Sequence, residues 1–335
     1  MNKSEQIARL RLIRTRNIGP MTYSLLMRRY GSAEAAIAAI PTLAQRGGSK
    51  ISLASIASVK DELESIDAAG AVLLWRDSEY YPERLAQFDD APACITARGN
   101  LHLLTQPMIA IVGARNASIN AQRHAHNIAS ELGKHGYIIV SGMARGIDAA
   151  AHRGALDTGT IGVIAGGIDI VYPPENADLF EEVASRGLLL AEMPPATKPT
   201  PKHFPIRNRV IASLAFGVAV AEAAHRSGSL ITAREAATRG SDVTAVLGSP
   251  LDPRSDGCNR LIRDGATLVQ NVADVIECVS RQPAVRIPPA QFEWTDSMRQ
   301  TIDQTAVDRC RQKLAQDLSL DPVDIDELIS WCEMP

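Results

Sequence analysis

The sequence predicts an α/β protein: a doubly wound, mainly parallel sheet with an all-helical domain before it and a short helical segment after it. Three observations predict this class. Short apolar runs alternate with segments of helical periodicity between residues 69 and 280. Residues 5–66 show helical patterns only, and residues 291–335 are again helical in pattern and acidic. We therefore expect domains at 1–68 and 69–280, a proline-containing linker at 281–290, and a C-terminal segment at 291–335.

At 335 residues with 45% hydrophobic content, the chain can bury a substantial core and has room for two or three domains. Its net charge of -3 is unevenly distributed. Residues 1–50 contain nine Lys/Arg and two Asp/Glu, whereas residues 290–335 contain four and ten. This asymmetry indicates either different partners for the two ends or two differently solvated helical faces, which is the commoner explanation.

The five cysteines are scattered and form no C-x-x-C pair, which favours reduced thiols over a disulfide framework or a zinc site. No apolar run approaches the roughly 18 residues that a membrane span needs, and the N-terminus lacks the apolar core of a signal peptide. We expect a soluble, cytoplasmic protein that does not contact a membrane.

The N-terminal helices are interrupted at Ile18, Gly19 and Pro20. Two helices joined through such a tripeptide resemble a SAM or helix-hairpin-helix domain, and the hairpin of the latter can hold a DNA phosphate on backbone N–H groups. A small helical packing domain without a ligand is an equally good interpretation. The arginines near the hairpin keep DNA binding open: Arg11, Arg14, Arg16, Arg28 and Arg29.

The centre of the second domain is a predicted strand–helix–strand unit. An apolar strand at 109–112 is followed by a helix that we expect Asn120 to cap and Gly136 to end. A second strand at 137–140 and a helix from Ile147 complete a right-handed βαβ unit. The same alternation predicts the remaining strands at 71–75, 93–97, 160–165, 188–191, 217–221 and 242–247. It also predicts helices at 175–186 and 230–239, and a short helix that ends at 214.

Glycine-containing loops follow several of these strands. Glycine lets backbone N–H groups approach an anion, and the next helix directs its positive end to the same place. One such loop is explained by a tight turn alone, but their repetition predicts an anion site at the carboxyl edge of the sheet. The candidate residues are Gly113, Arg115 and Ser118; Gly142, Arg145 and Gly146; and Ser227, Gly228, Ser229 and Thr232.

A basic segment before the helix that ends at 214 indicates a polyanionic ligand. Its candidate residues are Lys202, Phe204, Arg207, Asn208 and Arg209. The cations can hold consecutive phosphates, Asn208 can read a base edge, and Phe204 can stack on a base. Stacking of this kind requires unpaired bases, so we predict a single strand rather than a duplex.

Other ligands fit the sequence poorly. The first loop is not a G-x-G-x-x-G turn and no G-x-x-x-x-G-K-[ST] motif is present, which argues against NAD and against P-loop ATP hydrolysis. Asp148 and His152 share a helix face and could form an acid–base pair, but such a pair more often orients a helix. We expect no cofactor, no metal and no catalytic residue.

Five segments closely resemble the DNA-processing protein A (DprA/Smf) family: 111–118, 141–156, 172–176, 204–214 and 222–236. The resemblance implies a Rossmann-like domain that binds single-stranded DNA without sequence preference. It also implies loading of the RecA recombinase during natural transformation, and a homodimer, for which we expect residues 240–280 to form the contact. The residues that it marks for strand binding are Arg115, Lys202, Phe204, Arg207 and Arg209, with the glycine loops beside them.

The chain also departs from this family. Ser241 stands where relatives commonly have arginine, and Leu247 where they have proline, which puts one basic contact in doubt. Residues 323–331 resemble the start of a winged helix that is not completed.

An enzyme is the main alternative. Ser227 to Ser229 followed by Thr232 and Glu235 resembles the phosphate loop and T-x-x-E motif of nucleotide phosphoribohydrolases. Ile231 replaces the second glycine of that loop, and the basic segment 202–209 exceeds what one monophosphate needs. A purely structural scaffold is the third possibility.

Overall fold

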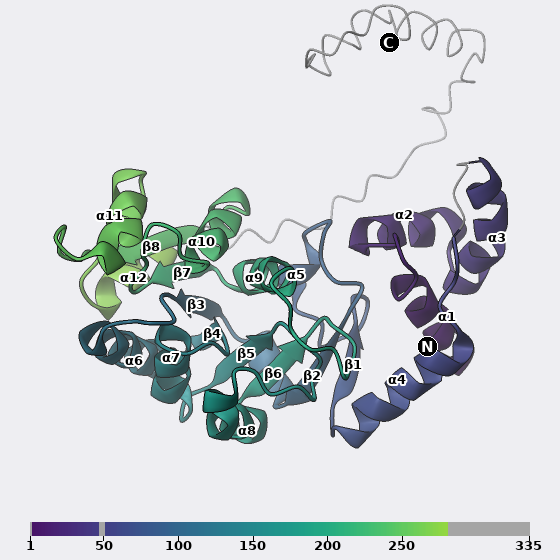
Figure 1. Ribbon diagram of the computed structural model, residues 1–335, viewed down its shortest axis with the longest axis horizontal. Helices are drawn as coiled ribbons and strands as arrows, with labels where there is room; N and C mark the ends of the chain where they lie inside the picture. The colour runs from purple at the N-terminus through teal and green to yellow at the C-terminus, as the bar shows by residue number, and fades with distance from the viewer. Residues whose placement is uncertain (1, 47–50, 281–335) are drawn as a thin grey trace, which may run out of the picture. The chain divides into compact units, whose positions relative to one another are not determined.

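The computed structural model describes residues 2–46 and 51–280 (Figure 1). The predicted linker and the acidic C-terminal segment, with its partial winged helix, lie outside the described residues. Within the described part, no helix is long and apolar enough to cross a membrane.

The N-terminal domain is helical, as predicted. Its helices are α1 (Lys3–Ile13), α2 (Pro20–Tyr30), α3 (Ala33–Arg46) and α4 (Ile56–Ala68). Gly19 precedes α2 with Pro20 as its first residue, and Gly31 ends it in the left-handed conformation at φ 75°. Among the arginines near the hairpin, Arg11 donates to Ala54 O and Arg14 to Glu62, so these two stabilise the helical domain itself.

The second domain contains a sheet whose described strands run in the order β1-β2-β6-β5-β4-β3-β7-β8-β9. Among the strands between residues 51 and 280, only the β1–β2 and β2–β6 pairs are antiparallel. The strands are β1 (Val72–Trp75), β2 (Cys94–Gly99), β3 (Met108–Val112), β4 (Ile138–Gly142), β5 (Thr160–Ile164), β6 (Leu188–Ala191), β7 (Gly217–Val220), β8 (Asp242–Val246) and β9 (Thr267–Val269). The chain adds strands to one side of β3 and then, from β7, to the other, so the order reverses beside β3. A ligand is expected outside the carboxyl ends of the strands near such a point.

Helices cover both faces of the sheet, which confirms the doubly wound prediction (Figure 1). Ala110 and Val112 of β3 pack into a core with the helices at 203–214 and 229–238. Ile109 and Ile111 pack into a second core with the helices at 119–134, 147–155 and 272–280. Burial on both faces explains why the strand is apolar throughout. The helices are α5 (Glu83–Ala86), α6 (Ile119–Lys134), α7 (Ile147–Ala155), α8 (Ala177–Arg186), α9 (His203–Leu214), α10 (Ser229–Thr238), α11 (Asp256–Arg263) and α12 (Val272–Ser280). Short 3₁₀ helices lie at Leu101–Thr105, Pro174–Asn176 and Pro253–Ser255.

Two details differ from the sequence prediction. Ser118, not Asn120, caps α6: its extended backbone precedes the helix, and its hydroxyl accepts a hydrogen bond from Ala121 N at 3.1 Å. The elements after residue 248 were not predicted. The strand among them, β9, has three residues of which one is buried, so it leaves no long apolar run in the sequence. Gly136 does adopt the left-handed conformation expected of it, at φ 85°.

Candidate nucleic-acid interface

A cavity of about 250 Å³ opens at the carboxyl edge of the sheet, above β3, β4 and β5. Residues from five loops or helix starts meet there, although they are far apart in the sequence. The side chains that give it its chemical character are Arg115, Arg145, Tyr172, Glu175, Phe204 and Arg207. The structure therefore brings together four of the sequence-predicted residues: Arg115, Arg145, Phe204 and Arg207.

The Phe204 ring contacts a cation and a second aromatic ring. The Arg115 guanidinium carbon is 4.7 Å from the centroid of the ring, and the Tyr172 ring centroid is 5.9 Å away at an interplanar angle of 53°. Such a group offers flat, partly exposed surfaces and a positive charge, which suits a base and its phosphate. Sequence reasoning did not select Tyr172, although it opens one of the family-like segments.

An exposed ion pair stands at the same cavity. Arg145 Nη1 lies 3.1 Å from a carboxylate oxygen of Glu175, and both side chains are more than half exposed. Ion pairs this exposed contribute roughly 0 to 1 kcal/mol to stability. Arg145 can therefore exchange Glu175 for another anion at little cost.

Arg207 is the buried cation of the cavity, with 8% of its surface exposed. Its Nη1 donates to Val163 O at 2.6 Å and its Nε to the Asn208 side-chain oxygen at 3.1 Å. A Cβ on Gly142 would lie 2.0 Å from Arg207 Nη1, so this glycine is required by packing against the guanidinium rather than by an anion. Burial lowers the pKa of Arg207, and the nearby Asp148 carboxylate opposes that shift.

Asp148 and His152 support the loop between β4 and α7. His152 Nε2 lies 2.6 Å from Gly142 O and therefore donates to it. Burial lowers the pKa of His152 to about 4, so the ring is neutral at pH 7. Its Nδ1 lies 2.7 Å from the Thr160 hydroxyl oxygen. Asp148 accepts from Ala144 N at 3.3 Å. These contacts agree with an orienting role for the pair.

Two of the predicted anion loops already hold a carboxylate of the protein. At the start of α6, Glu222 accepts from Ser118 N at 2.9 Å and from the Ser118 hydroxyl at 2.7 Å. At the start of α7, the Asp148 carboxylate accepts from the backbone N–H of Ala144 in the preceding loop. Since the positive end of a helix attracts any carboxylate, Ser118 is engaged internally and is not open to an external phosphate.

Gly113 and Gly146 have packing explanations as well. A Cβ on Gly113 would lie 2.5 Å from Ile147 Cγ1, and a Cβ on Gly146 would lie 2.3 Å from Ala114 O. Gly146 also has a φ of 75°. These glycines allow the loops after β3 and β4 to touch, which brings Arg115 and Arg145 to one cavity.

The predicted cup at the start of α10 lies outside the cavity walls. The hydroxyls of Ser227 and Ser229 are 2.7 Å apart, Gly228 is exposed, and Thr232 is buried. The buried Asn208 donates to Gly228 O at 3.3 Å while it accepts from Arg207, so its amide links two protein groups and does not face a base.

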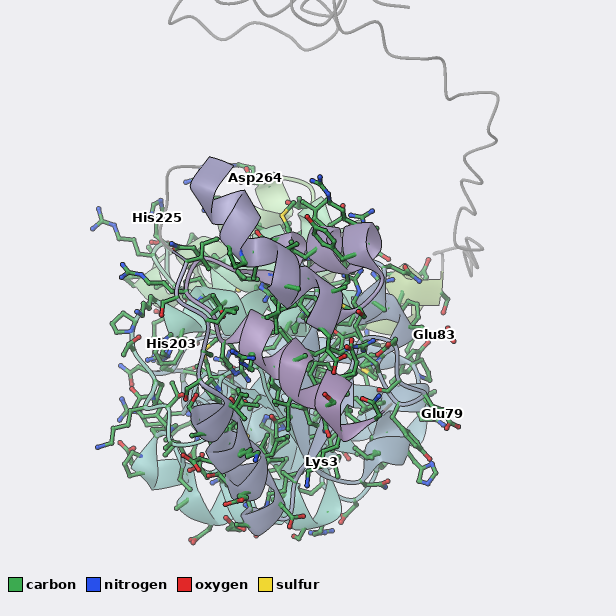
Figure 2. All side chains as sticks on the ribbon, turned by 90° about the vertical axis from the view of Figure 1, so that its right-hand side faces the viewer. Lys3, Glu79, Glu83, His203, His225 and Asp264 are labelled. Atoms are coloured by element: carbon green, nitrogen blue, oxygen red, sulfur yellow. The ribbon has the colours of Figure 1, made fainter. Side chains whose placement is uncertain are left out.

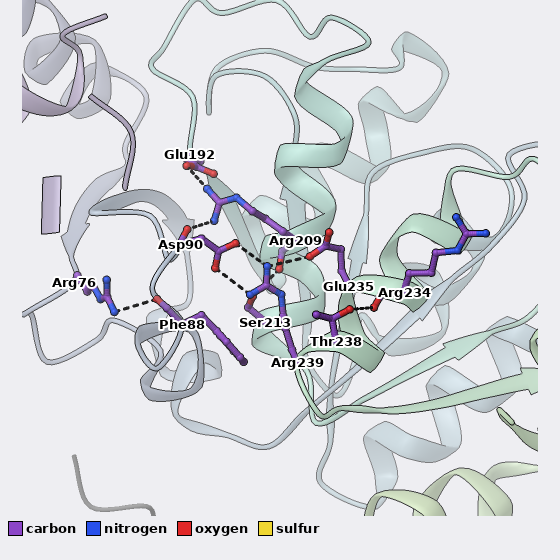
Figure 3. A network of polar contacts seen from close by, with 10 residues as sticks. All are labelled: Arg76, Phe88, Asp90, Glu192, Arg209, Ser213, Arg234, Glu235, Thr238 and Arg239. Atoms are coloured by element: carbon purple, nitrogen blue, oxygen red, sulfur yellow. Dashed lines mark hydrogen bonds and ion pairs between the residues drawn. The ribbon is translucent and has the colours of Figure 1, made fainter. Parts of the chain in front are cut away.

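Arg209 is not among the residues that line the cavity. It belongs instead to a network of polar contacts with Asp90 and Glu192 (Figure 3). Its guanidinium donates to Asp90 O and to Glu192, and the side chains of this ion pair are 14% and 17% exposed. The sequence predicted a phosphate contact here, but the structure gives Arg209 internal partners. In the same network Arg239 binds Asp90 and Glu235. Glu235, the acid of the enzyme alternative, thus serves an ion pair and is absent from the cavity walls.

Exposed basic groups extend beyond the cavity. Lys202 is exposed at the start of α9, two residues before Phe204. Figure 2 shows the neighbouring His203 projecting outward on the same side as His225, opposite Glu79 and Glu83. The described residues include no group of three or more His, Cys, Asp or Glu side chains that could hold a metal ion.

The chain matches two family models and is similar to several known proteins. A family model described as "DNA recombination-mediator protein A" matches residues 72–280, and one described as "DprA-like N-terminal HHH domain" matches residues 3–65. The DNA processing protein DprA of Streptococcus pneumoniae (strain ATCC BAA-255 / R6) is 46% identical over 198 residues, covering 58% of this chain and 70% of that protein.

Two solved structures are also similar. The X-ray structure of DNA processing protein A from Streptococcus pneumoniae aligns with a TM-score of 0.63 and 40% identity, covering 67% of this chain and 78% of that chain. A structure of DNA processing protein A from Helicobacter pylori, described for its "unique single-stranded DNA binding mode", aligns with a TM-score of 0.57 and 31% identity. This second alignment covers 62% of this chain and 94% of the other.

Proposed function

Because the chain belongs to the DNA recombination-mediator protein A (DprA/Smf) family, we propose that it binds single-stranded DNA of any sequence and loads the RecA recombinase onto it. The observation that carries the proposal is the cavity in which Arg115 lies over Phe204, beside Tyr172 and Arg145. The related Helicobacter pylori protein, described for binding single-stranded DNA, supports the choice of ligand.

The chemistry of the cavity favours an unpaired base. The cavity is lined by an aromatic ring and by cations, which suits the flat face of an exposed base and its phosphate. Stacking on an aromatic ring contributes about 1–3 kcal/mol per base and is tolerant of sequence, because every base has a flat face. Duplex DNA keeps its bases stacked on each other and cannot use this surface.

Exposed cations hold the backbone in this proposal. Arg115, in the loop after β3, and Lys202, two residues before Phe204, are both exposed. Arg145 can bind a phosphate in place of Glu175. Each phosphate neutralised on a single strand adds about 0.7 to the slope of log affinity against log salt. We expect these contacts to dominate affinity, since the chain contains only 4% aromatic residues.

Family membership supports the partners and domains that we propose. We place the helical domain at 1–68 and the DNA-binding domain at 69–280, supported by the two matched regions. We further propose a homodimer through residues 240–280, where Leu247 and Leu251 are exposed apolar side chains at 57% and 92%. A RecA partner and a role in natural transformation imply a cytoplasmic location.

Reversing the charge of Arg115 tests the binding proposal. Arg115→Glu is expected to weaken binding of labelled oligo-dT about tenfold or more at low salt and to reduce the salt slope by roughly 0.7, the value for one phosphate contact. Fluorescence anisotropy at several salt concentrations measures both quantities.

Arg123→Glu is the matched control, because Arg123 is an exposed arginine of α6 that does not line the cavity. It makes the same change in net charge and is expected to alter affinity far less. Equal losses in the two variants would show that only net charge matters, and the proposed interface would be wrong.

A further inference from the structure

Arg207 has hydrogen-bond donors that the protein does not use. Its Nε donates to Asn208 and its Nη1 to Val163 O, whereas Nη2 has no hydrogen-bond partner among the described residues. Nη2 is not among the fully buried polar atoms that lack a partner, so this atom keeps some exposure. Arg207 as a whole is only 8% exposed, and it lines the cavity. The part of the guanidinium with unused donors is therefore the part that faces the cavity.

Arg207 also lies deepest among the polar groups of the cavity. Arg115, Arg145, Tyr172 and Glu175 are exposed, and Phe204 is partly so, whereas Arg207 is buried and reaches Val163 O in β5. A base that enters with its sugar at the mouth directs its far edge to this depth. That edge carries O4 in thymine and O6 in guanine, but an amino group in cytosine and adenine.

We propose that Arg207 reads this far edge, so that the cavity prefers a base with a carbonyl there, thymine or guanine, over cytosine or adenine. A guanidinium can only donate hydrogen bonds. Where Nη2 meets the exocyclic group, a carbonyl oxygen gives it an acceptor, whereas an amino group sets donor against donor. The neighbouring ring nitrogen has the opposite character, so the preference requires Nη2 to meet the exocyclic group itself. The side-chain acceptors among the other polar groups, Glu175 and the Tyr172 hydroxyl, are exposed, so they do not offer an amino group a partner at this depth.

This inference rests on the proposed single-strand binding and assigns a specificity-determining residue to it. It remains compatible with binding to any natural sequence, because a strand of mixed sequence offers a carbonyl-bearing base in some register. The preference concerns which base occupies the cavity, not whether the strand binds.

Wild-type protein and oligo-dT, oligo-dU and oligo-dC of one length test the inference without a variant. Uracil and cytosine differ only at C4, which carries an oxygen or an amino group, and at the neighbouring N3. Like cytosine, uracil lacks the methyl group of thymine. Oligo-dT and oligo-dU are expected to bind about five- to tenfold more tightly than oligo-dC, where tenfold corresponds to about 1.4 kcal/mol. Equal affinities for oligo-dU and oligo-dC would overturn the inference and leave the proposed function intact. Binding of none of the three would overturn the proposed function, and the inference with it.

Arg207→Gln assigns the preference to this side chain, since a carboxamide can both donate and accept. The variant is expected to bind oligo-dU and oligo-dC within about twofold of each other, which is about 0.4 kcal/mol. Thermal unfolding shows whether it folds, and the wild-type comparison stands if it does not. A purely structural role would weaken both oligonucleotides alike and keep their ratio, which would overturn the assignment. Arg145→Ala is the control, expected to weaken both equally because Arg145 lies at an exposed ion pair.

Discussion

Replacing Phe204 by alanine is expected to weaken binding of oligo-dT about 10- to 100-fold, because stacking on an aromatic side chain contributes roughly 1–3 kcal/mol per base. The Arg115 guanidinium carbon lies 4.7 Å from the ring centroid, so the variant also loses this cation–π contact. A cation–π contact of this kind contributes about 0.5–1 kcal/mol at an exposed site. Anisotropy titrations of the wild type and the variant measure the loss.

Phe204→Tyr serves as the matched control, since it keeps the ring face and its contact with Arg115. It is expected to bind within a few-fold of the wild type. If the tyrosine variant loses as much affinity as the alanine variant, the ring does not stack on a base and the cavity is not the binding site.

Replacing Arg209 by alanine is expected to act on stability rather than on DNA. Glu192 would keep a buried carboxylate without its cation, and its Oε2 already has no hydrogen-bond partner among the described residues. Removing one member of a fully buried pair typically lowers the free energy of unfolding by about 3–5 kcal/mol. Because these two side chains are 14% and 17% exposed, we expect a loss at or below the lower end of that range. Urea-induced unfolding measures this loss, while affinity for oligo-dT is expected to change little.

The loss should depend on pH with a defined sign. Burial raises the pKa of Glu192 in the folded protein, and removing Arg209 raises it further. A carboxyl whose folded pKa is raised is easier to bury when protonated, so the Arg209→Ala variant is expected to recover stability as the pH is lowered. Arg234→Ala, at an exposed arginine of α10, is the control and should leave stability almost unchanged. A stable Arg209→Ala variant with weak DNA binding would instead support the phosphate contact predicted from sequence.

The fold was predictable because each central strand is buried on both faces. In β3, alternate residues enter two different cores, so the apolar run is continuous and stands out in the sequence. The edge after β8 was not predictable by the same means. β9 is short, and only Val269 of its three residues is buried, so it leaves little periodicity to detect.

The candidate site was predictable in its location and less so in its membership. Loops that follow parallel strands meet at one edge, which is why Arg115, Phe204 and Arg207 could be grouped from sequence. The partners of other candidates could not be read in this way. Glu222 is 104 positions from the Ser118 that it binds, and Arg209 is 17 from Glu192. Only the folded chain shows that these carboxylates occupy the places where phosphates were expected.

Competition between single-stranded and duplex DNA tests the central claim most directly. Labelled oligo-dT bound to the protein is challenged with unlabelled oligo-dT or with a duplex of the same length, at low and at physiological salt. A cavity that accepts one unpaired base against Phe204 requires the single strand to compete more strongly at both salt concentrations. Equal competition by the duplex would mean that charge alone binds DNA, and the cavity would have no part in it.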